Sequence, residues 1–337
     1  MMTPISLPEY EGARGKPAAL VALANRQRLK LHEAPSQSLF RVVALFYISF
    51  GPSASRQQGV VEGYNAEQSY IGGAICAERA ALTQLRKYEE PEIHEVVITT
   101  DSREAISPGI LCREYLTTSA QPETVIILGN SDGSILSDFK LREIHPFPYL
   151  YRTYTREQMA SAGEAFGLKC RQCKLNKDKN NGSNNNDNTG WSEEERALYD
   201  AALAAVDTSP RTLTLHPISF GAAVRFADNT VEASGYLPAL EYGASVCPVQ
   251  LLCRELDKRV RANGPLPIII VQVDQFGTAH CPFASARTLL NEHFDRDLKV
   301  LYHDENALER SCFSAELCPP PPGPGASFLT HDAFLGT

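Results

Sequence analysis

The chain has 337 residues, enough for two domains with separate cores, and its 43% hydrophobic and 21% charged residues are typical of a globular protein. Its formal net charge of −8 argues against a nucleic-acid partner, because such binding depends on clustered Lys and Arg. The most apolar run, 40–50, is too short to cross a bilayer, and nine scattered cysteines suit free thiols or metal ligands in a reducing compartment. We therefore expect a cytoplasmic protein with no membrane partner and no secretory signal.

Residues 1–150 alternate helical patterns with short apolar strands. In chain order they predict a helix at 17–34, a strand at 38–50, a strand that ends in a turn at 59–65, a helix at 76–90, a strand at 94–100, a helix at 110–118, a strand at 124–130, and a turn and strand at 131–136. Such alternation is typical of an α/β layer architecture.

The region 151–190 is interpreted as a linker. Its segment 174–190 is polar and Asn-rich, so it cannot bury enough surface to offset chain entropy, and we expect it to be disordered. A helix is predicted at 191–205. The last segment, 318–337, is Pro-rich and is expected to be an extended tail.

An internal repeat links the two halves of the chain. Three pairs of landmarks recur in the same order, each after 171 to 174 residues: Gly63 and Gly235, Cys76 and Cys247, Pro108 and Pro282. Each match is weak alone, but the near-constant offset predicts that one fold occurs twice.

Two motifs most clearly indicate a catalytic or metal-binding function: C-A-E-R at 76–79 and S-P-x-x-x-C-R at 107–113. Upstream lie S-x-F before an apolar strand, with Ser38 and Phe40, and the turn G-Y-N-A-E over 63–67. This ordered series, which spans most of 17–150, resembles the zinc-dependent cytidine deaminase family, in which a Cys or His and a Glu precede Pro-Cys-x-x-Cys.

The resemblance implies an α/β fold, a three-layer α/β/α sandwich with a mixed five-stranded sheet, present twice. It implies a catalytic domain at 1–150 and a second domain at 191–317. Zn²⁺ would be held by Cys76 and Cys112, thiolates that helix N-termini favour. Glu78 would be the catalytic proton carrier, and Arg79 would support the thiolates. Phe40, Asn65 and Glu67 match positions that contact the base and ribose of a nucleoside, so the implied partner is a small-molecule nucleoside.

One ligand position departs from the family pattern. Gly109 stands where the family has a cysteine, which leaves two thiolates instead of the usual three protein ligands of a catalytic zinc. Asp101 and the C-x-x-C pair Cys170 and Cys173 are candidate replacements. The alternatives are purely structural roles. Cys76 and Cys112 could be buried core cysteines, and Glu78 could be a carboxylate in the first turn of a helix, favoured there by the helix dipole.

The second repeat has lost more of the motif. Cys247 remains, but Val249, Phe283 and Ala286 stand at the positions of the Glu and the later cysteines, and valine cannot carry a proton. We expect this copy to be structural. The resemblance also implies that two such two-domain chains form a homodimer.

Three functions remain open from the sequence. The first is hydrolytic deamination of cytidine or deoxycytidine, as in pyrimidine salvage. The second is a catalytically inactive deaminase fold that binds a nucleoside or a protein partner, because of Gly109. The third is deamination of a different aminopyrimidine.

Overall fold

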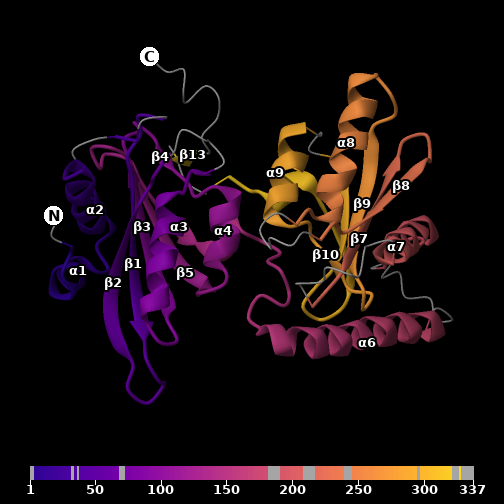
Figure 1. Ribbon diagram of the computed structural model, residues 1–337, viewed down its shortest axis with the longest axis horizontal. Coiled ribbons are helices and arrows are strands. Elements are labelled where there is room, and N and C mark those ends of the chain that lie inside the picture. The colour runs from indigo at the N-terminus through magenta and orange to yellow at the C-terminus, as the bar shows by residue number, and fades with distance from the viewer. Residues whose placement is uncertain are drawn as a thin grey trace. The chain divides into compact units, whose positions relative to one another are not determined.

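The computed structural model describes residues 4–31, 34–35, 38–67, 73–180, 190–207, 217–238, 245–293, 297–320 and 326–327. The chain forms two compact units (Figure 1). The first contains Met1–Pro146 and Pro319–Thr337, and the second contains Phe147–Cys318.

The first unit is built on one five-stranded sheet. Its helices are α1 (Leu7–Ala13), α2 (Pro17–Leu29), α3 (Ala77–Gln84, followed by a 3₁₀ turn at Leu85–Lys87), α4 (Ile110–Leu116) and α5 (Leu141–Ile144). Its strands are β1 (Val42–Phe50), β2 (Gln57–Tyr64), β3 (Glu92–Thr100), β4 (Ala105–Ile106), β5 (Ala120–Gly129), β6 (Leu136–Lys140) and β13 (Ala326–Ser327). The sheet order is β2-β1-β3-β5-β6, in which only β3 and β5 are parallel.

Strand β1 lies in the middle of three layers. Its residues Val43, Leu45 and Tyr47 join the core beneath α1 and α2, and the alternate residues Ala44, Phe46 and Ile48 join the core beneath α3 and α4. Because successive side chains of a strand point to opposite faces, a strand buried on both faces needs a continuous apolar run, which 42–50 supplies. The α/β sandwich predicted from the sequence is confirmed for this unit.

Gly63 brings the site-bearing helix close to the sheet. A Cβ atom at Gly63 would lie 2.1 Å from the carbonyl oxygen of Ala77 and 2.3 Å from the amide nitrogen of Ala81. Only glycine permits this approach, so α3 packs directly on β2. The start of α3, where Cys76 and Glu78 lie, is thereby fixed against the sheet.

The second unit repeats this topology. Its elements are the helices α6 (Arg156–Asn180), α7 (Glu193–Val206), α8 (Pro248–Arg261) and α9 (Ala284–His293), a 3₁₀ turn at Ser314–Leu317, and the strands β7 (Phe220–Phe226), β8 (Val231–Gly235), β9 (Pro267–Asp274), β10 (Ala279–His280), β11 (Lys299–His303) and β12 (Glu309–Phe313). The sheet order β8-β7-β9-β11-β12 matches that of the first unit strand for strand, and β10 adds a sixth strand beside β9.

Isolated β-bridges mark the repeat at single-residue resolution. Ala66 pairs with Ile75 in the first unit, and Leu237 pairs with Val246 in the second, each 171 residues later. Both bridges close the turn that precedes a cysteine, Cys76 or Cys247. The duplicated fold predicted from the sequence is confirmed.

The region expected to be a linker is largely helical. Helix α6 runs to Asn180, through the first part of the segment predicted to be disordered, while 181–189 lie outside the described residues. Gly163 and Gly167 let α6 approach Phe276, because Cβ atoms there would lie 2.6 Å from the Phe276 ring and 2.3 Å from its carbonyl oxygen. This packing, which local composition does not reveal, orders the helix.

Two further predictions differ from the structure at the chain ends of the first unit. The helix expected at 17–34 ends at Leu29, and the short helix α1 precedes it. The C-terminal segment, expected to be a tail, contributes β13, which pairs in parallel with β4. No helix among the described residues is both long and apolar enough to span a membrane.

Candidate active site

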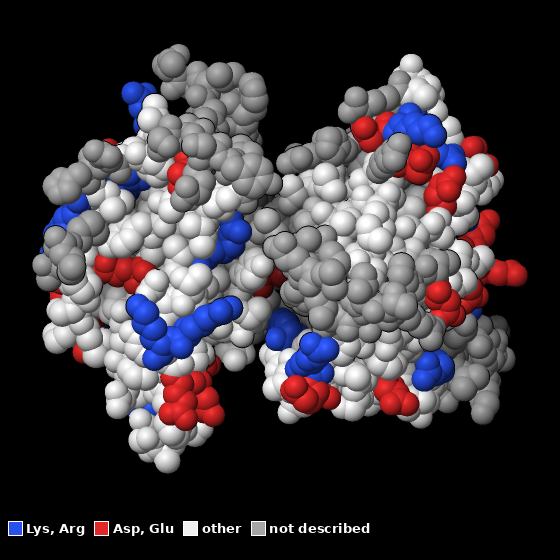
Figure 2. Space-filling model, viewed as in Figure 1, with Lys and Arg blue, Asp and Glu red and all other residues white. Residues whose placement is uncertain are grey.

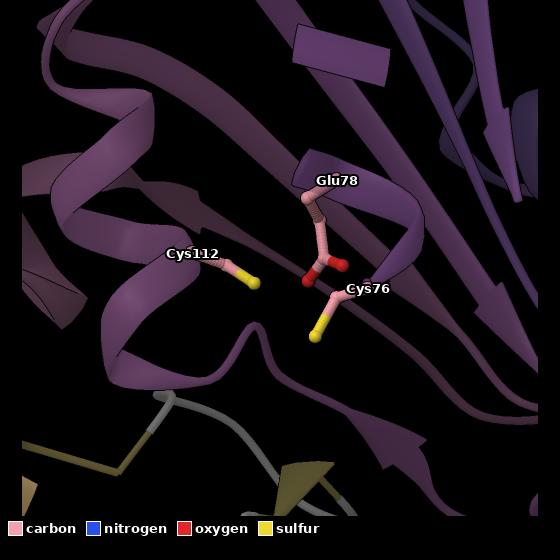
Figure 3. Close-up of side chains that lie close together, drawn as sticks. All are labelled: Cys76, Glu78 and Cys112. Atoms are coloured by element: carbon pink, nitrogen blue, oxygen red, sulfur yellow. The ribbon is translucent and has the colours of Figure 1, made fainter. Parts of the chain in front are cut away.

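Two helix starts in the first unit bring the motif residues together (Figure 3). Cys76 precedes the first residue of α3, Glu78 lies in its first turn, and Cys112 lies in the first turn of α4. The two thiol sulfurs and a carboxylate oxygen of Glu78 all lie within 4.8 Å of one another. Glu78 and Cys112 are buried, with 4% and 1% of their surfaces exposed. The three residues therefore face one shared space.

The charge balance of this cluster favours one ionised thiol. A hydrogen bond from Cys112, together with the Arg79 guanidinium, lowers the pKa of Cys76 to about 6 despite burial. The pKa of Cys112 is raised, first because it donates that hydrogen bond and then by burial. Arg79 Nη2 lies 3.6 Å from the Cys76 sulfur and also donates to the carbonyl oxygen of Ala74, at 3.2 Å. This places Arg79 beside the thiols, as the sequence predicts.

Glu78 is poised between its charged and neutral forms. Burial, and next the charge of Cys76, raise the pKa of its carboxyl group to about 7. A carboxyl group with a pKa near neutrality can both accept and return a proton, which is the property that general acid–base catalysis requires.

A pocket of about 230 Å³ opens onto this cluster. The residues that line it include every predicted site position except Arg79 and Cys112: Phe40, Asn65, Glu67, Cys76, Glu78 and Gly109. Ser38, Val42 and Ile106 complete much of the wall. The sequence interpretation thus selected residues from four separate segments that the fold brings to one cavity.

Asn65 and Glu67 hold the pocket wall in place. The Asn65 side chain accepts a hydrogen bond from the Val42 amide at 2.8 Å and donates to the Phe40 carbonyl oxygen at 2.7 Å. The Glu67 carboxylate accepts from the amide and hydroxyl of Ser38, at 2.7 and 2.6 Å. These bonds connect the turn before α3 to the segment that carries Phe40.

The donor set available to a zinc ion is two thiolates with one carboxylate beside them. Thiolate sulfur and carboxylate oxygen are both zinc ligands, and three protein ligands with one open position are usual in catalytic sites. At Gly109 a Cβ atom would meet no other heavy atom within 4 Å, so the place of the family's cysteine is open space. Cys76 and Cys112 are therefore the thiolate ligands available, with Glu78 beside them.

The proposed substitutes for the missing cysteine have other environments. Asp101 forms ion pairs with Arg28 and Arg41, and its carboxylate also accepts from the Arg41 amide at 2.9 Å. Cys170 and Cys173 lie on α6 in the second unit. Among the described residues, the only group of three or more metal-ligating side chains is Cys76, Glu78 and Cys112. None of the three substitutes belongs to it.

Sequence reasoning missed one buried residue next to the site. The Arg113 side chain is fully buried and donates from Nε to the Pro108 carbonyl oxygen at 2.9 Å and from Nη2 to the Ser107 hydroxyl at 3.0 Å. It thus ties the loop that carries Gly109 to the helix that carries Cys112. The repeat contained the signal, because Arg287 lies 174 residues later, the offset of Pro108 and Pro282.

Comparisons with known proteins agree with the motif. No family model matches the chain. A cytidine deaminase from Halalkalibacterium halodurans is 27% identical over 100 residues, which cover 30% of this chain and 71% of the relative. This similarity agrees with the resemblance to the cytidine deaminase family that the ordered series of motifs indicates.

Two solved structures of cytidine deaminases also share partial similarity with this chain. The enzyme from Mycobacterium leprae shares 21% identity with a TM-score of 0.32, over 38% of this chain and 99% of that one. The enzyme from Burkholderia pseudomallei shares 22% identity with a TM-score of 0.32, over 39% of this chain and 97% of that one.

Proposed function

We propose that the first unit catalyses the zinc-dependent hydrolysis of cytidine or deoxycytidine to the uridine product and ammonia. The observation that carries this proposal is the convergence of Cys76, Glu78 and Cys112 within 4.8 Å at the end of a pocket. Zinc bound by the two thiolates would supply a nucleophilic water at neutral pH.

The proton transfers are assigned to Glu78. Its carboxylate would take one proton from the attacking water and deliver it to the ring nitrogen, and would then take the second proton from the new hydroxyl group and deliver it to the departing amine, which leaves as ammonia. A buried group with a pKa of about 7 can serve in both directions. The low exposure of Glu78 also keeps competing bulk water away from the carboxylate.

The pocket residues are assigned to substrate binding. Phe40 would lie against the base, and Asn65 and Glu67 would bind the ribose hydroxyls. A carboxylate that accepts hydrogen bonds from hydroxyl groups suits a free nucleoside and repels a phosphate. On the face drawn in Figure 2, basic side chains of the described residues lie beside acidic ones in small groups. That pattern suits a small neutral substrate better than a polyanion.

A second candidate function is a nucleoside-binding protein without catalysis. The observation that favours it is the open space at Gly109, which leaves two thiolates if Glu78 acts only as the proton carrier. Fewer protein ligands weaken metal binding, and without the metal the hydrolytic step has no activated water.

The test is the zinc content of the full chain together with ammonia release. Protein purified with zinc and a reducing agent should hold about one zinc per chain and release ammonia from cytidine or deoxycytidine. A panel of other aminopyrimidines tests the substrate class, and light scattering tests the proposed homodimer. Absence of zinc and of ammonia, with retained cytidine binding, would establish the binding protein instead.

A further inference from the structure

Arg113 joins three separate stretches of the first unit. Besides its bonds to Ser107 and Pro108, its Nη1 donates to the carbonyl oxygen of Ile144 at 2.5 Å and to that of Pro319 at 2.9 Å. A guanidinium group has five donors in a rigid fork and can hold several oxygens in one geometry. Pro319 lies 206 residues away in sequence, at the start of the C-terminal segment that belongs to this unit.

The same C-terminal segment makes a second attachment beside the site (Figure 1). Strand β13 pairs in parallel with β4, with Ala326 opposite Ala105 and Ser327 opposite Ile106. Ile106 lines the pocket and is followed directly by Ser107, Pro108 and Gly109. The segment therefore contacts both the strand that enters the site loop and the arginine that holds the loop.

The second unit contains a corresponding set of arginine hydrogen bonds but lacks the counterparts of Glu78 and Cys112. Arg287 is buried and donates from Nε to the Pro282 carbonyl oxygen at 2.6 Å and from Nη1 to that of Leu317 at 3.3 Å. Its Nη2 donates to the carbonyl oxygen of Phe147. In each unit, then, the buried arginine donates a hydrogen bond to the carbonyl oxygen of a residue remote in sequence. The second unit provides a matched control, because its loop leads to Phe283 and Ala286, which cannot bind a metal.

We propose that the C-terminal segment, through Pro319 and β13, is a positioning element of the active site. It completes the hydrogen bonds of Arg113 and adds a strand to β4, and thereby fixes the Ser107–Gly109 loop and the place of Cys112 beside Cys76. Removing groups that orient metal ligands typically weakens metal binding about 10- to 100-fold. The inference rests on the proposed function only for its zinc and activity readouts.

Two truncations of the full chain test the proposal. A chain that ends at Cys318 loses both attachments, whereas a chain that ends at Ser327 keeps them. We expect the shorter chain to show faster hydrogen exchange over 105–116, unchanged exchange over α2, and about tenfold weaker zinc binding in competition with a chelator. The longer chain should match the intact protein. Equal exchange over 105–116 in all three chains would overturn the proposal.

Point variants separate positioning from general stability. Arg113→Met should speed exchange over 105–116 and weaken zinc binding, and Arg113→Lys, which keeps a charged donor, should recover part of the loss. Arg287→Met should speed exchange over 281–290 and leave zinc binding unchanged. If Arg287→Met weakens zinc binding as much as Arg113→Met, the proposal is wrong. If Arg113→Met does not fold, the truncation pair decides the question.

The hydrogen-exchange outcomes are independent of the proposed reaction. An intact protein that binds zinc but releases no ammonia would contradict the deaminase activity. The exchange difference between the two truncations would still measure whether the C-terminal segment holds the site loop.

Discussion

The two repeats share a fold but differ in what occupies the same place. In the first unit, Val42, Ile106 and Gly109 line the pocket. Val42 pairs with Thr100 in the first unit, and Phe220 pairs with Asp274 in the second. Thr100 and Asp274 are separated by the 174-residue offset of this part of the repeat, so Phe220 corresponds to Val42. By the 174-residue offset of β4 and β10, His280 corresponds to Ile106 and Phe283 to Gly109.

Aromatic rings fill that place in the second unit. The ring centroids of Phe220 and Phe283 lie 5.0 Å apart, those of Phe220 and His280 5.8 Å, and those of Tyr149 and Phe283 5.6 Å. Because protein interiors are close-packed, a pocket that no longer serves a ligand is better filled than left empty. The comparison teaches that a few side chains decide whether this architecture presents a cavity or a core.

The largest expected difference between the repeats concerns Glu78 and its counterpart Val249. Glu78→Gln removes the proton carrier but keeps the shape of the side chain, so the deamination rate should fall about 10²- to 10⁴-fold. Initial rates of ammonia release measure this. Zinc content should stay the same, since the two thiolates remain; zinc loss would mean that Glu78 is itself a ligand.

The matched control is Val249→Glu. Val249 is fully buried, and Ala286 stands at the position that corresponds to Cys112. We expect no added deaminase activity and a lower free energy of unfolding, because a buried carboxyl group without a partner is costly. A second active site created by this single change would refute the view that the second unit is structural.

The next largest effect concerns the open space at Gly109. Gly109→Cys adds a third thiolate where its Cβ meets no other atom, and one further ligand should tighten zinc binding about 100-fold. Chelator competition gives the affinity. Gly109→Ala adds the same Cβ without sulfur and should change nothing. If the alanine variant binds zinc as tightly as the cysteine variant, backbone stiffening and not ligation is responsible.

Much of the candidate site could be predicted because its signals are local. Cys76 and Glu78 lie two residues apart at a helix start, and the apolar run of β1 identifies a strand buried on both faces. The repeat offset then predicted a second copy of the same fold. Each of these inferences uses only neighbouring residues or one constant spacing.

The features that sequence reasoning missed depend on contacts between distant residues. Helix α6 is packed on Phe276, about 110 residues later, while its last part, 174–180, belongs to a segment whose composition is typical of disorder. The bond from Arg113 to Pro319 spans 206 residues. No local pattern encodes either partner, so both emerge only once the chain is folded.

A reciprocal swap tests the packing difference between the repeats. Phe220→Val, which gives the second unit the residue of the first, should lower the free energy of unfolding by about 2–3 kcal/mol through lost burial and a residual cavity. Val42→Phe should fill part of the first unit's pocket and raise the KM for the nucleoside about tenfold, with smaller change in kcat. Urea unfolding and steady-state kinetics measure the two effects. An unchanged KM would place the substrate elsewhere.

The smallest expected effect is an acid sensitivity confined to the second unit. His303 is 6% exposed, and its Nδ1 accepts a hydrogen bond from the Ala279 amide at 2.9 Å. Burial, and next the neighbouring His280, lower the pKa of His303 to about 4, while Asp274 and Asp304 act in the opposite direction. The corresponding residue of the first unit, by the 174-residue offset, is Gly129, which cannot titrate.

The direction of the pH effect follows from proton counting. Between pH 6.5 and 4 the unfolded chain binds a proton at His303 that the folded chain excludes, so stability decreases as the pH falls through this window. From pH 6.5 to 5 the free energy of unfolding should drop by about 2 kcal/mol. Trp191, the only tryptophan of the chain, lies with its ring 4.9 Å from that of His303 and reports this unit by fluorescence. His303→Asn keeps an acceptor for Ala279 without a titrating ring, so it should flatten the pH dependence; an equal slope in this variant would assign the acid sensitivity to another group.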